Sequence, residues 1–149
     1  MLRALKRALA NAGEPKTDSG LERRHLQIAV AVLLHEARRA DYDEGGDESG
    51  VAEQALMDLF GLEKDAAVEV LRQGRARAHE LTSFYAPLST IKRDFTPERR
   101  VQLIEHLWRV TFADGLLDLY EDHYVRKIAH LLYVPNTQSM LARNRARGS

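Results

Sequence analysis

The fold is decided by two stretches, ADGLLDLYEDHYVRKIAHLL (residues 113–132) and ADYDEGGDESGVAEQALMDL (residues 40–59). A shift of 73 positions aligns them, so that Asp41 and Glu48 correspond to Asp114 and Glu121. In each stretch the acidic segment is followed by apolar residues at helical spacing. The sequence therefore predicts two helix–acidic loop–helix units. Since neither unit can bury its apolar face alone, we expect the two to pack into one bundle.

The same spacing extends outward over most of the chain, and no stretch alternates as a half-buried strand does. We therefore predict an all-α fold, a single helical bundle of about six to seven helices. Gly74 lies inside one predicted helix, where glycine costs up to about 1 kcal/mol relative to alanine, and it indicates a close crossing or a bend. The first three expected helices cover Leu21–Asp41, Val51–Phe60 and Lys64–Tyr85, and Tyr85 is expected on the buried face of the third. A turn or short helix follows over Pro87–Asp94. One further helix starts at Thr96, and another runs from Asp118 and ends at Pro135.

Three parts of the chain differ in composition. Residues 1–20 combine a short amphipathic segment with a linker rich in small and polar residues, and residues 21–135 hold the predicted bundle. Residues 136–149 form a basic tail that could add one short helix.

Composition limits the classes of function. The 149 residues suit one domain, and 22 basic residues balance 22 acidic ones, so no overall field favours a nucleic-acid partner. The chain has no cysteine, which excludes disulfides and cysteine-ligated zinc. The longest apolar run, Ile28–Leu34, is much shorter than the roughly 20 residues of a membrane span. The first residues lack the pattern of a secretory signal, and we expect a cytoplasmic protein.

The repeated motif resembles that of the TerB family, the helical domain named after bacterial tellurite-resistance proteins and related to the N-terminal region of the co-chaperone DjlA. The match rests on Ala113-Asp114-Gly115, Asp118 and Glu121, followed by Val125 to Leu132, and on Ala40-Asp41 and Glu48 in the first unit. The first unit departs from the pattern, with Tyr42 where glycine is usual. The resemblance implies an all-helical fold, binding of a divalent cation by acidic residues and a stress-associated setting. It implies no catalytic activity.

The acidic residues themselves support a cation site. Residues 41–53 contain six acids and no basic residue, but they lack the bidentate glutamate of an EF-hand loop. A looser site that draws on both loops would suit a hard cation with oxygen ligands, favouring Ca²⁺ or Mg²⁺ over Zn²⁺. The candidate metal ligands are Asp41, Asp43, Glu48, Asp114, Asp118 and Glu121.

An alternative interpretation needs no ion. Carboxylates are common at helix starts, where they cap the first turn and interact favourably with the helix dipole. Asp118 and Glu121 fit such a capping pair. In this interpretation the domain is a protein–protein interaction adaptor, and its acids only order helix ends.

The sequence shows no arrangement of catalytic residues. None of the six histidines falls in a His-Glu-x-x-His pattern, and there is no nucleophile elbow or phosphate-binding loop. We therefore expect a binding module with an unknown protein partner. Leu2, Leu5 and Leu9 line one side of a basic segment, which would let residues 1–10 lie against a membrane surface. The basic run Arg143, Arg145 and Arg147 lacks the interleaved aromatic residues of a single-strand binder, so we expect no nucleic-acid partner.

Overall fold

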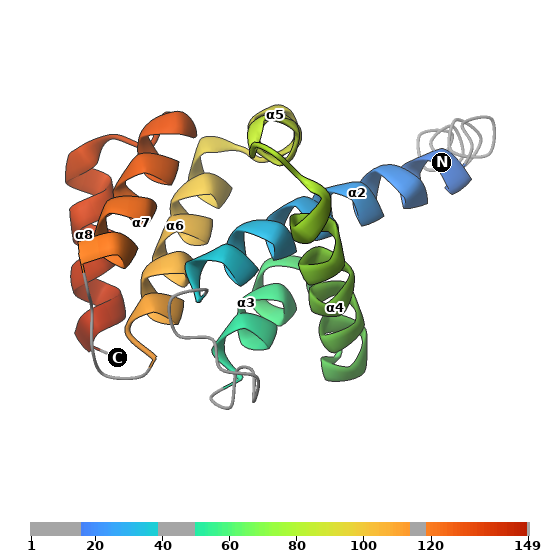
Figure 1. Ribbon diagram of the computed structural model, residues 1–149, viewed down its shortest axis with the longest axis horizontal. Helices are drawn as coiled ribbons and strands as arrows, with labels where there is room; N and C mark the ends of the chain where they lie inside the picture. Colours follow the sequence, from blue (N-terminus) through green and yellow to red (C-terminus); the bar gives the residue numbers. More distant parts are fainter. Residues whose placement is uncertain (1–15, 39–49, 114–118, 149) are drawn as a thin grey trace, which may run out of the picture.

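The computed structural model describes residues 16–38, 50–113 and 119–148. Within these ranges the chain forms helices and no strand, which confirms the predicted all-α class (Figure 1). None of the helices described is long and apolar enough to cross a membrane. The helices are α2 (Lys16–Ala37), α3 (Val51–Phe60), α4 (Lys64–Glu80), α5 (Tyr85–Asp94), α6 (Pro97–Thr111), α7 (Leu119–Leu131) and α8 (Asn136–Gly148).

Two helices organise the bundle. Helix α2 packs against α4 and α5 on one side, and α6 packs against α7 and α8 on the other (Figure 1). Helix α3 contacts α2, α4 and α6 and so joins the two groups. The apolar faces that the sequence predicted meet along α2 and α6, and the core lies between these helices and their neighbours.

Trp108 lies at the centre of the α6 side of the core and is fully buried. Its ring stacks on Phe112 with the centroids 6.2 Å apart, and its Nε1 donates to the hydroxyl of Ser139 on α8 at 3.4 Å. A buried indole N–H usually finds such a partner, because an unpaired donor is costly to bury. The other large side chains with almost no exposure are Leu33, Leu34, Leu56, Ile91, Leu103, Ile104, Leu107, Ile128 and Leu132.

Gly74 lies where α4 crosses α2, which confirms the close crossing predicted from the sequence. A Cβ atom at this position would lie 2.4 Å from the Cβ of Ala31 and 2.8 Å from its carbonyl carbon. Only glycine allows the two backbones to come this close.

Two predicted helix boundaries are confirmed by their local chemistry. Gly61 ends α3 with a φ of 69°, a left-handed conformation that glycine adopts without steric cost. At the start of α6 the hydroxyl of Thr96 accepts a hydrogen bond from the backbone N–H of Arg99 at 3.2 Å, and Pro97 follows at the first helical position.

The prediction that one helix runs from Lys64 to Tyr85 was wrong. Helix α4 ends at Glu80, because Leu81 is extended, and the N–H of Tyr85 bonds to the hydroxyl of Ser83 at 3.3 Å as α5 begins. Tyr85 is therefore not on a buried face but is 76% exposed. The predicted turn or short helix after it is the helix α5, which tolerates Pro87 in its first turn.

Two further helix bounds differ from those predicted. Helix α2 begins at Lys16, before the expected Leu21, and the tail forms the full helix α8, which packs on α6. Leu34 and Leu107, which the shift of 73 positions aligns with each other, are both fully buried. Because the acidic segments that carry the repeat lie outside the described residues, the repeat itself stays a prediction.

Candidate metal site

Five of the six predicted metal ligands, Asp41, Asp43, Glu48, Asp114 and Asp118, lie outside the described residues. The sixth, Glu121, lies in the first turn of α7 and is only 5% exposed. Among residues 16–38, 50–113 and 119–148, no three histidine, aspartate or glutamate side chains are grouped so that they could hold a metal ion. The described residues nearest to the predicted site are those that flank the two acidic segments.

The end of α2 lies beside the start of α7. The hydroxyl of Tyr120 donates to Oε2 of Glu36 at 3.3 Å, and the hydroxyl of Tyr124 donates to the backbone oxygen of Leu33 at 2.9 Å. Burial raises the pKa of Tyr124 well above its ordinary value, with smaller contributions from Glu36 and Tyr120, so this hydroxyl keeps its proton. These contacts bring the residues before the first acidic segment next to those after the second.

The start of α3 lies beside the last turns of α6. Gly50 and Val51 share a cavity of about 460 Å³ with Arg109. The other side chains that line it are polar: Gln54 donates to Asp58 at 2.8 Å, and Nε2 of His106 lies 3.9 Å from Oδ2 of Asp58. The residues after the first acidic segment are thus next to those that lead into the second.

His106 in this cavity is held in its neutral form. Burial lowers its pKa, and the charge of Arg109 lowers it further, although Asp58 and Glu105 act in the opposite direction. No sequence motif distinguishes this histidine from the other five. Its distance from Asp58 depends on how α3 packs on α6, which no local sequence pattern reports.

Glu53 places a further carboxylate near this end of the bundle. It lies in the first turn of α3, and its Oε1 is buried with no hydrogen-bond partner among residues 16–38, 50–113 and 119–148. A buried carboxylate oxygen without a partner is costly, and a bound cation or water would satisfy it. Glu53 belongs to the acidic run of residues 41–53. It was not predicted as a ligand, because it lies one residue beyond the position of the bidentate glutamate in an EF-hand loop.

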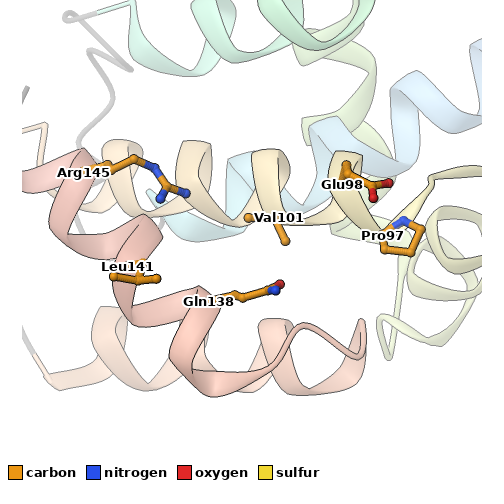
Figure 2. A pocket seen from close by; sticks show the side chains of 6 residues that line it. All are labelled: Pro97, Glu98, Val101, Gln138, Leu141 and Arg145. Carbon is orange, nitrogen blue, oxygen red and sulfur yellow. The ribbon is translucent and has the colours of Figure 1, made fainter.

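The basic run of the C-terminal tail is largely neutralised within the chain. Arg145 bonds to Glu105 at 2.7 Å, Arg143 lies 3.6 Å from Asp122 and over the ring of Trp108, and Arg147 bonds to Asn144 at 3.1 Å. Figure 2 shows Arg145 reaching from α8 towards α6 at one end of a shallow cavity of about 360 Å³ whose middle is formed by apolar residues such as Val101. Arg143 and Arg145 thus tie α8 to α7 and α6, whereas the bond of Arg147 stays within α8.

Comparison with known proteins agrees with the fold. Residues 27–144 match the family described as tellurite resistance protein TerB. The crystal structure of a protein of unknown function from Porphyromonas gingivalis W83 is similar, with a TM-score of 0.60 and 20% sequence identity over 83% of this chain and 89% of that chain. A search of curated proteins found no match. Because the family match covers most of its length, this chain belongs to the TerB family.

Proposed function

We propose that this TerB domain is a non-enzymatic module that binds a divalent cation through its two acidic segments. The observation that carries the proposal is the convergence of the flanking residues. Glu36 contacts Tyr120, and Gly50 lines the same cavity as Arg109, so both ends of each acidic segment are anchored at neighbouring helix ends. The ligand set would be Asp41, Asp43, Glu48, Asp114, Asp118 and Glu121.

The chemistry of these residues favours a hard cation. Carboxylates supply only oxygen, which suits Ca²⁺ or Mg²⁺, whereas Zn²⁺ prefers the nitrogen and sulfur ligands that this set lacks. Glu53, whose buried Oε1 has no hydrogen-bond partner in the part of the chain that the structure describes, adds one more carboxylate at the start of α3. A cation held by both segments would tie α2 and α3 to α6 and α7, and binding would stabilise the folded state. The matching family is described as tellurite resistance protein TerB, and we propose the same setting for this module.

The adaptor interpretation remains the second candidate, and one observation favours it. Glu121 and Asp122 both lie in the first turn of α7, where carboxylates interact favourably with the helix dipole without any ion. In that case the acids order helix ends and the domain acts through a protein partner.

A thermal melt separates the two candidates. The chelator-treated chain is melted alone and with Ca²⁺, Mg²⁺, Mn²⁺ or Zn²⁺. A ligand at 100 times its Kd adds about 2.7 kcal/mol to the folded state, which for a chain of this size raises Tm by roughly 5–10 °C. We expect that rise with Ca²⁺ or Mg²⁺ and its loss in the Asp41→Asn, Asp114→Asn double variant.

Asp65→Asn is the matched control, since Asp65 is an exposed acid in the first turn of α4, and it should keep the ion-dependent rise. If none of the four ions shifts Tm, the cation module is refuted and the adaptor interpretation takes its place.

A further inference from the structure

A cavity of about 700 Å³ lies between the α4–α5 corner and α7. We call it the aromatic groove. It is bounded by Leu81, Phe84 and Tyr85 on one side and by Tyr120, Tyr124 and Lys127 on the other. Its volume falls within the roughly 300–1,000 Å³ typical of small-molecule sites. Most of its lining is apolar or aromatic, as in such sites, and the polar side chains are those of Glu36, Thr82, Ser83, His123 and Lys127.

The floor of the groove is already ordered. The rings of Phe84 and Tyr124 meet edge to face with their centroids 6.5 Å apart, and the Tyr124 hydroxyl is bonded to the backbone oxygen of Leu33. A ligand would therefore meet the faces and edges of fixed rings, and it would lose little free energy in ordering side chains.

The walls expose apolar surface that a ligand could cover. Tyr85 is 76% exposed and Tyr120 is 44% exposed, and both line the groove, Tyr85 from α5 and Tyr120 from α7. Rings stack in offset or edge-to-face arrangements, so these walls suit a flat, ring-sized apolar body.

Two charged side chains of opposite sign, Glu36 and Lys127, line the groove, and they differ because Glu36 already has a hydrogen-bond partner. Glu36 accepts a hydrogen bond from Tyr120. Lys127 is exposed, and within the part of the chain described here its ammonium group forms no hydrogen bond or ion pair. His123 lies one turn before Lys127 on the same side of α7 and also lines the groove, where its ring offers a further hydrogen-bond donor. An anionic group on the ligand would pair with Lys127.

We propose that the aromatic groove binds a small amphipathic anion, a carboxylate carried on an aromatic ring system. The apolar body lies between Tyr85 and Tyr120 over the Phe84–Tyr124 floor, and the carboxylate faces Lys127. The proposal is tested with chelator present, so that a bound cation does not affect the result.

The test uses three probes with the same ring and different charge: naphthalene-2-carboxylate, naphthalene-2-carboxamide and 2-naphthylmethylamine. Each is titrated into the ¹⁵N-labelled full chain in the presence of chelator, and chemical shifts are followed. We expect the carboxylate to bind in the millimolar range, as suits a ligand of its size, with shifts at residues 81–88 and 120–131. The carboxamide should bind about threefold to fivefold more weakly, which is the upper part of the range of a solvent-exposed ion pair, and the amine more weakly still.

Variants assign the charge effect to one residue. Lys127→Gln should reduce the affinity for the carboxylate to that for the carboxamide, and Lys127→Arg should retain it. Lys92→Gln is the control, because Lys92 lies over the Tyr133 ring and not in the groove. Equal affinity for the three probes, shifts that map elsewhere, or a Lys127→Gln variant that binds the carboxylate as the native chain does would each overturn the proposal.

Discussion

The crossing of α2 and α4 makes a quantitative prediction for Gly74→Ala. The new Cβ would lie 2.4 Å from the Cβ of Ala31 and 2.8 Å from its carbonyl carbon. Carbon atoms pack best at about 3.5–4.0 Å, so the helices must separate by roughly 1 Å or one of them must bend. The backbone of Ala31 is one of the obstacles, so a change of side-chain rotamer cannot relieve the contact.

The expected cost follows from two opposing terms. Overpacking a well-packed core typically costs about 1–3 kcal/mol, and a clash with backbone belongs in the upper part of that range. Alanine is a better helix former than glycine, which offsets up to about 1 kcal/mol of this destabilisation. The net loss in the free energy of unfolding should therefore be about 2 kcal/mol, which lowers Tm by roughly 4–8 °C for a chain of this length.

Urea unfolding, followed by far-ultraviolet circular dichroism and by the fluorescence of Trp108, measures this loss. Gly20→Ala in α2 is the matched control, because nothing lies within 4 Å of its added Cβ and it should be neutral or stabilising. Adding Ala31→Gly to Gly74→Ala removes the closer contact but leaves the carbonyl carbon in place, so the pair should recover only part of the loss. A Gly74→Ala variant as stable as Gly20→Ala would show that the two helices do not cross this closely.

Two further predictions concern the α6 side of the bundle. Thr96→Ala removes the side-chain cap on the Arg99 N–H and should lower the free energy of unfolding by about 1 kcal/mol, measured by urea unfolding, while Thr96→Ser should retain most of it. Burial holds the pKa of His106 below its ordinary 6.5, so the unfolded chain takes up this proton more readily as the pH falls through that value. The free energy of unfolding should therefore decline below pH 6.5, and less steeply in His106→Gln; equal slopes in the two proteins would contradict the assignment.

Local chemistry explains which features could be predicted from the sequence. The cap at Thr96 and the left-handed end at Gly61 depend on residues a few positions apart, so their identity is enough to place them. Gly74 was informative for a related reason, since glycine inside a helix is unfavourable unless a neighbouring backbone requires it. Periodicity likewise placed the buried faces of α2, α6 and α7, because packing in a bundle follows the helical repeat.

The candidate sites depended on contacts that the sequence does not encode locally. The 3.9 Å separation of His106 and Asp58 arises from the packing of α3 on α6. The convergence of Glu36 and Tyr120 arises from the docking of α7 beside the end of α2. The six acidic residues could be recognised by composition, but the contacts that bring their flanks together could not.

The aromatic groove forms at the break between α4 and α5, which the periodicity of the sequence did not predict. The apolar residues from Val70 to Tyr85 continue at helical spacing, so periodicity predicted one helix and a buried Tyr85. The extended Leu81 ends α4 early, and α5 then packs on α2 instead of continuing the line of α4. This turn leaves Tyr85 in solvent and sets the corner residues opposite α7 with a cavity between them. Tyr85→Ala in the naphthalene-2-carboxylate titration measures how much this exposed ring contributes to binding in the groove.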